Sequence, residues 1–166
     1  MQRVLVDSLS GKVLYEKNAD EKLPPASMTK LASMLLIMES IDNGTLKFDD
    51  MVTISEEAAN MGGSQVFLQA GESYSVRDLL KSIAIASGND AVYAMSEKIG
   101  GSHEEFVNML NKRLKEIGAV NTNFVNAHGL DAEGHYSTAR DMSIIARELL
   151  KHEKILEYTS IYEEYL

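Results

Sequence analysis

A long apolar segment directly after two prolines limits what this chain can fold into. Pro24-Pro25 forces an extended approach. From Ser27, apolar residues recur at steps of three and four until Asn43-Gly44 ends the pattern. The part from Met28 to Met38 is so apolar that we expect a helix buried inside a core. The remaining segments must therefore supply elements that surround this helix.

The segment before the prolines predicts strands. Val4-Leu5-Val6 and Val13-Leu14-Tyr15 flank the turn-rich stretch 7–11, a pattern typical of a β-hairpin. Brief extended pieces are expected at 51–54 and 123–126. A hairpin of two strands is only marginally stable alone, so we expect its partner strands in the sheet to lie beyond Leu166.

Five further helices are predicted after the one at Ser27, over residues 55–60, 75–86, 89–99, 102–117 and 138–150. Three of them start with a hydroxyl residue and an acidic residue three positions later, namely Ser75 with Asp78, Ser102 with Glu105 and Thr138 with Asp141. The chain shows no internal repeat and no linker. We therefore predict one α+β domain over residues 1–166, with the N-terminal hairpin beside a helical subdomain.

Composition excludes several classes of function. The chain has 16 basic and 25 acidic residues and a formal charge of -9, which disfavours binding to nucleic acid or to anionic lipid. It contains no cysteine, so cysteine catalysis and zinc-thiolate sites are excluded. No segment reaches the length of a membrane span, and the apolar run at 4–6 is too short for a signal peptide. If the protein is exported, its signal peptide is expected to be absent from this sequence.

The motif Ser27-Met28-Thr29-Lys30 places a hydroxyl and an amine on the same face of the first helical turn. A desolvated lysine near cationic groups can lose its proton and accept the proton of a serine nucleophile. The plain alternative is an N-cap serine followed by a solvated lysine. The apolar helix that follows favours the catalytic interpretation, because a lysine at its buried end requires a reason.

A second motif, Ser87-Gly88-Asn89, lies between two helical patterns, where a turn would direct its side chains outward from rigid supports. Its alternative interpretation is a Ser-Gly helix break with Asn89 capping the next helix.

Together the two motifs resemble those of penicillin-binding proteins and serine β-lactamases, whose signature combines Ser-x-x-Lys, Ser-Asp-Asn and Lys-Thr-Gly. With Ser-Gly-Asn as the middle motif, the chain is most similar to the serine D-Ala-D-Ala carboxypeptidases. The similarity extends over the segments 11–15, 24–30, 61–64 and 134–139. The resemblance implies a β-lactamase/transpeptidase-like fold, with the active site between the sheet edge and the helical subdomain.

The resemblance also implies a mechanism of acyl transfer on peptidoglycan stem peptides ending in D-Ala-D-Ala. Ser27 would attack the penultimate carbonyl, and Lys30 would accept its proton. Ser87 would relay that proton to the leaving D-alanine, and Asn89 would hold the lysine and the substrate amide. β-Lactams would acylate Ser27. The resemblance implies no cofactor and no metal, and it implies action outside the cytoplasmic membrane, with any membrane anchor in segments absent from this sequence.

One departure from the family pattern is the absence of Lys-Thr-Gly, Lys-Ser-Gly or His-Thr-Gly after Asn89. In the family this third motif supplies charge for the substrate carboxylate and an oxyanion donor, and losing one such donor costs about a hundred- to a thousandfold in rate. We therefore expect a truncated chain that is weakly active or inactive alone. Non-catalytic binding of peptidoglycan or of a partner is the alternative from another class. A β-lactamase is the nearer rival, although its Glu-x-x-Leu-Asn signature is not found.

The histidines offer a separate possibility. His128 and His135 bracket Asp131 and Glu133, a set of residue types that can bind a metal. No spacing on a helix face supports such a site, so we interpret the segment as a surface loop with ordinary polar residues. His103, beside a capping serine, is expected to be structural or to face solvent.

Overall fold

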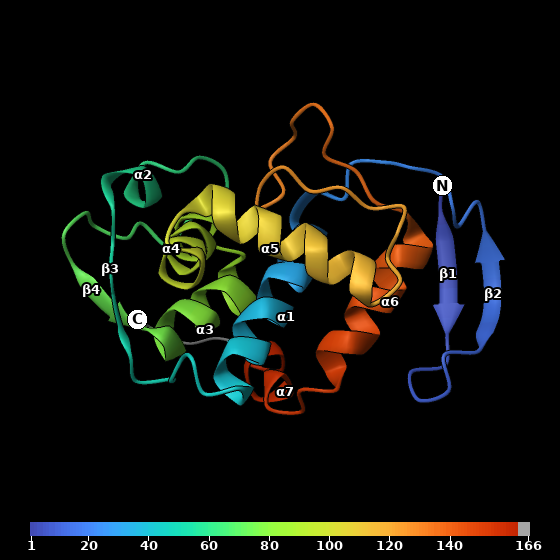
Figure 1. Ribbon diagram of the computed structural model, residues 1–166, viewed down its shortest axis with the longest axis horizontal. Coiled ribbons are helices and arrows are strands. Elements are labelled where there is room, and N and C mark those ends of the chain that lie inside the picture. Colours follow the sequence, from blue (N-terminus) through green and yellow to red (C-terminus); the bar gives the residue numbers. More distant parts are fainter. Residues whose placement is uncertain (163–166) are drawn as a thin grey trace.

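The computed structural model describes residues 1–162, and the last four residues of the predicted domain lie outside the described residues. The described residues form a mixed helical and stranded fold, as predicted (Figure 1). Its strands are β1 (Arg3–Val6), β2 (Val13–Lys17), β3 (Met51–Thr53) and β4 (Ser73–Ser75). Its helices are α1 (Thr29–Asp42), α2 (Glu56–Ala59), α3 (Val76–Ala86), α4 (Asn89–Gly100), α5 (His103–Glu116), α6 (Ala139–Leu150) and α7 (Ile155–Thr159).

Helix α1 lies in the middle of the molecule and packs against α4, α5 and α6 (Figure 1). Ten of its 14 residues are buried, more than in any other helix of the described chain. This burial follows from a segment that is apolar on almost every side, because such a helix is stable only when other elements surround it. The prediction of a buried helix after Pro25 is confirmed.

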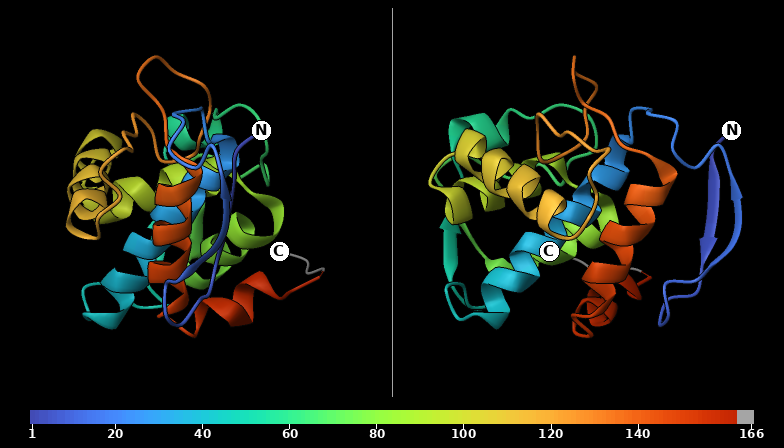
Figure 2. Two further views of the ribbon diagram at one scale, coloured as in Figure 1. Left: turned by 90° about the vertical axis from the view of Figure 1, so that its right-hand side faces the viewer. Right: turned by 45° about the vertical axis from the view of Figure 1, so that its right-hand side comes forward.

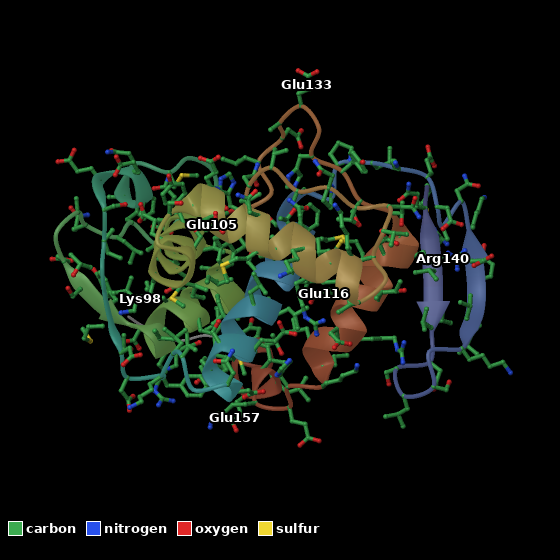
Figure 3. The ribbon with its side chains drawn as sticks, viewed as in Figure 1. Lys98, Glu105, Glu116, Glu133, Arg140 and Glu157 are labelled. Atoms are coloured by element: carbon green, nitrogen blue, oxygen red, sulfur yellow. The ribbon has the colours of Figure 1, made fainter. Side chains whose placement is uncertain are left out.

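The N-terminal hairpin is also confirmed. Strands β1 and β2 pair antiparallel, with Leu5 opposite Tyr15. The hairpin lies at one end of the molecule, where β1 contacts α6 (Figure 2). Arg140 of α6 faces the hairpin and bonds to Glu16 at 2.8 Å and to Asp20 at 2.7 Å (Figure 3).

The opposite end holds a second small sheet, in which β3 pairs antiparallel with β4 (Figure 1). The extended piece at 51–54 was predicted, whereas β4 was not. Helix α7 was not predicted either. Its Tyr158 is buried and stacks on Phe48, with ring centroids 5.8 Å apart.

The predicted N-caps explain where three helices begin. The side-chain oxygens of Ser75, Ser102 and Thr138 each accept the backbone N–H three residues later, at 3.1 Å in every case. Within the described residues, none of the helices combines the length and apolar character needed to cross a bilayer.

Candidate active site

Ser27 lies at the surface on the turn that leads into the buried helix. Residues Ala26–Met28 form a single 3-10 turn, and α1 begins two residues after Ser27. Ala26 has a φ of 49°, in the left-handed region that few non-glycine residues adopt. No side-chain capping hydrogen bond is made at the start of the 3-10 turn or of α1. The interpretation of Ser27 as an N-cap serine is therefore wrong.

Lys30 is buried directly behind Ser27 and is only 3% exposed. Its Nζ lies 3.4 Å from the Ser27 Oγ and donates to the backbone carbonyl of His128 at 2.9 Å. The predicted contact between hydroxyl and amine is thus present, and the interpretation of a solvated lysine is wrong. The two side chains meet because residues three apart share one face of a helical turn.

Burial lowers the pKa of Lys30 to about 8, because removing the amine from water disfavours its charged form. At pH 7 roughly a tenth of such a group is neutral, against well under a thousandth for an ordinary lysine. The amine therefore has the two properties of a general base for Ser27, contact with the hydroxyl and a neutral form near physiological pH.

Asn89 and Ser87 come from the junction between α3 and α4. Ser87 ends α3 in the left-handed region with φ 55°, and Asn89 is the first residue of α4. The Asn89 side chain donates to the carbonyl of Gly62 at 2.6 Å, and its backbone N–H donates to that of Ser64 at 2.7 Å. Among the described residues no hydrogen bond joins Asn89 to Lys30.

A cleft of about 430 Å³ brings two of the predicted site residues together. Ser27 and Asn89 both line it. Lys30 and Ser87 are not among the lining residues, and Lys30 is buried behind Ser27. The other lining residues come from three loops: Ala26, Gly63, Ser64, His128, Gly129, Leu130 and Asp131. The loop that contributes residues 128–131 to the cleft extends from the body of the protein, with Glu133 at its tip (Figure 3).

Asp90, which the sequence analysis did not single out, holds one of these loops in place. It is fully buried, and its carboxylate accepts the backbone N–H groups of Val66, Leu68 and Ala91 at 3.1, 3.1 and 2.9 Å. Its position next to Asn89 was the available signal, because an acidic residue in the first turn of a helix often binds backbone amides. Asp90 thereby fixes the chain just after Ser64 against α4.

Asp90→Asn is expected to lower the free energy of unfolding by about 2 kcal/mol. The amide group offers one acceptor oxygen in place of two, so a buried N–H is left without a partner. Urea unfolding measures the change. Asp49→Asn is the matched control, because the Asp49 side chain is 89% exposed and its loss is expected to cost less than about 0.5 kcal/mol. Equal effects of the two substitutions would contradict this role of Asp90.

His135 and Gly129 attach the loop of residues 125–135 to the start of α1. The Nδ1 of His135 accepts the N–H of Val125 at 3.1 Å, so its Nε2 carries the proton and donates to the Thr29 hydroxyl at 2.9 Å. Gly129 has φ +93° and packs directly on the carbonyl of Ala26. Thr29, which lies between Ser27 and Lys30 in the motif, is thus bonded to a segment more than a hundred positions away in the sequence.

The interpretation of residues 128–135 as an ordinary surface loop is wrong for both histidines. His128 is 7% exposed and His135 is 3% exposed. Burial lowers the pKa of His128 to about 4 and also lowers the pKa of His135. Among the described residues, no group of three or more His, Asp or Glu side chains is arranged to hold a metal ion. Both imidazoles instead act as neutral hydrogen-bonding groups within the protein.

The chain is similar to known proteins over its whole sequence. The family model of D-alanyl-D-alanine carboxypeptidases, peptidase S11, matches residues 1–166. The D-alanyl-D-alanine carboxypeptidase DacF of Bacillus subtilis is 58% identical over 163 residues, which cover 98% of this chain and 42% of that protein. The chain thus spans about two fifths of the length of this curated relative.

The chain is also similar to solved structures over most of its length. The D-alanyl-D-alanine carboxypeptidase DacD from Francisella tularensis matches with a TM-score of 0.92 at 38% identity, over 94% of this chain and 38% of that one. Penicillin-binding protein D2 from Listeria monocytogenes, in its ampicillin-bound form, matches with a TM-score of 0.85 at 30% identity, over 96% of this chain and 65% of that one.

Proposed function

Because the chain belongs to the peptidase S11 family of D-alanyl-D-alanine carboxypeptidases, we propose that the full-length protein removes the terminal D-alanine of peptidoglycan stem peptides. The predicted β-lactamase/transpeptidase-like fold is confirmed by the structural matches. The proposal concerns the full-length protein, because the match covers only 42% of the Bacillus subtilis relative.

The observation that carries the proposal is the contact between an exposed serine hydroxyl and a buried amine. Lys30 Nζ lies 3.4 Å from Ser27 Oγ, and burial brings the pKa of the amine to about 8. A hydroxyl with its normal pKa is a poor nucleophile and needs an adjacent base that is neutral when the substrate arrives. Lys30 meets this need, and the carbonyl of His128 at 2.9 Å holds the amine in place.

In the proposed reaction, the Ser27 oxygen attacks the carbonyl of the penultimate D-alanine as its proton passes to Lys30. The tetrahedral intermediate then collapses and the peptide C–N bond breaks. The leaving D-alanine amine takes the proton from Lys30 through the hydroxyl of Ser87. Water hydrolyses the resulting ester and restores the Ser27 hydroxyl. Asn89, which lines the cleft, binds the substrate amide.

Two further parts of the proposal concern ligands and location. The structural relative from Listeria monocytogenes was solved in an ampicillin-bound form, and we expect β-lactams to acylate Ser27 of this protein as well. The substrate is a component of the bacterial cell wall, so we place the reaction on the outer side of the cytoplasmic membrane.

Mass spectrometry after exposure to penicillin tests the proposal. The expected result is a mass gain equal to one intact penicillin, located on the tryptic peptide of residues 23–30, which contains Ser27 as its only serine. Heat-denatured protein is the control and is expected to gain no mass, because the adduct requires the folded site. An adduct on another peptide would refute Ser27 as nucleophile. No adduct on folded full-length protein would favour a non-catalytic module that binds peptidoglycan.

A further inference from the structure

Three aromatic rings form a stacked column that ends at His128. The backbone carbonyl of His128 accepts the hydrogen bond from Lys30. Tyr93 of α4 stacks on His103 of α5 with centroids 4.4 Å apart and planes 8° from parallel. His103 in turn stacks on His128 of the loop, at 5.7 Å and 20°. The column thus connects two helices with the loop that covers the Lys30 amine.

The middle ring is fixed at its edge as well as on its faces. The hydroxyl of Ser96 donates to the Tyr93 carbonyl at 2.6 Å, so its one hydrogen is already used. The same oxygen lies 2.8 Å from Nδ1 of His103 and must accept the proton of that nitrogen. His103 therefore carries its proton on Nδ1 and has a defined orientation.

The last ring is held equally firmly within its loop. Leu130 donates its N–H to Nδ1 of His128 at 3.2 Å, so that nitrogen carries no proton. Asn126 accepts the N–H of Gly129 at 2.7 Å and donates to the carbonyl of Leu130 at 2.8 Å. These bonds tie the His128 ring to its own turn, so a movement of the ring would carry the backbone carbonyl of His128 with it.

We propose that His103 is a positioning residue for the amine of Lys30. It supports the His128 ring by stacking, and the carbonyl of His128 accepts the hydrogen bond from Nζ at 2.9 Å. His103 is not among the residues that line the cleft, so it acts through His128 and not on a substrate. The inference rests on the proposed role of Lys30 as the base.

Removing the ring of His103 exposes one face of the His128 ring, so the turn of residues 126–130 can shift as a unit away from Lys30. Water then reaches the amine, and the pKa of Lys30 rises from about 8 toward its ordinary value, because burial is the cause of its shift. A rise of about one pH unit reduces the neutral fraction at pH 7 about tenfold. The hydrogen bond from Nζ to the loop also lengthens.

Several titratable groups of the described residues act on the rings of the column. His103 from α5, Lys30 from α1 and His135 from the same loop face His128, and the positive charge of each, when it is protonated, lowers the pKa of His128. Glu57 and Glu97 act on Tyr93 at the far end. Burial lowers the pKa of His103 as well as that of His128. Both rings are therefore neutral at pH 7 and above, so a titration step between pH 7 and 9 in this region belongs to Lys30.

The test compares His103→Ala, His103→Phe and the surface control Asn108→Ala from the same helix, all in the full-length protein. The first measurement is the rate of acylation by a β-lactam between pH 6 and 10. The second is an NMR titration of the ¹⁵N-labelled Lys30 amine. The NMR titration does not depend on activity, so it remains decisive even if the unchanged protein is not acylated and the proposed function fails.

For His103→Ala we expect the Lys30 midpoint to rise by about one pH unit and the acylation rate at pH 7 to fall about tenfold. His103→Phe retains a stacking ring and is expected to stay within about twofold of the unchanged protein. Asn108→Ala is expected to change neither quantity. An unchanged Lys30 midpoint in His103→Ala would overturn the proposal, even with a lower melting temperature. A His103→Phe protein that behaves like His103→Ala would overturn the stacking mechanism.

Discussion

Replacing Lys30 with arginine is expected to lower the rate of β-lactam acylation about a thousandfold. A positioned general base contributes about a hundred- to ten-thousandfold, and arginine cannot act as one because it keeps its proton at every accessible pH. In the unchanged protein the acylation rate should rise with pH through about 8, since in the proposed reaction Lys30 acts in its deprotonated form. In Lys30→Arg this rising limb should disappear.

The measurement is the acylation rate with a fluorescent penicillin between pH 6 and 10. Lys30→Met accompanies the arginine variant, because its neutral side chain fits a buried site and separates loss of the base from the cost of a buried charge. Lys98→Arg is the matched control. Lys98 is exposed on α4 (Figure 3), and its replacement should leave both rate and pH profile unchanged. If Lys30→Met keeps more than a tenth of the original rate, Lys30 is not the base.

Most helices of this domain could be predicted because their signals are local. The apolar pattern and the N-caps at Ser75, Ser102 and Thr138 depend only on neighbouring residues, and all of them are present. Strand β4 and helix α7 could not be predicted in this way. The three residues of β4 are strand because they pair with β3, and α7 contains Tyr158, which is buried against Phe48. Their stability comes from distant partners that a local pattern does not contain.

The same distinction applies to the candidate site. The spacing of Ser27 and Lys30 predicts their contact, because one helical turn sets it. The partners that hold them are backbone carbonyls, such as those of His128 for Lys30 and Gly62 for Asn89. Every residue has a carbonyl, so no side-chain pattern indicates which one will serve. The burial of the histidines was missed for a related reason, since a polar loop sequence does not reveal that it folds back over a helix.

The second large effect of a substitution is expected at Gly129. Its backbone packs so closely on the carbonyl of Ala26 that there is no room for a side chain. A Cβ at this position would overlap the carbonyl of Ala26 and lie 3.0 Å from the Thr29 hydroxyl. Gly129→Ala is therefore expected to lower the free energy of unfolding by about 3 kcal/mol, from crowding plus the strain of a left-handed backbone. Ala26 directly precedes Ser27, so the proposed nucleophile is expected to shift with it. A displacement near 1 Å typically costs about a hundredfold in rate.

Gly44→Ala separates the two contributions. Gly44 has a similar φ of +80° after the end of α1, but a Cβ there meets no atom within 4 Å. We expect Gly44→Ala to cost only the backbone strain, about 1 kcal/mol, and to leave the acylation rate unchanged. Urea unfolding and acylation with fluorescent penicillin measure both quantities for each variant. If Gly129→Ala matched Gly44→Ala in stability and rate, the close packing of Gly129 on Ala26 could not be what holds Ser27 in position against Lys30.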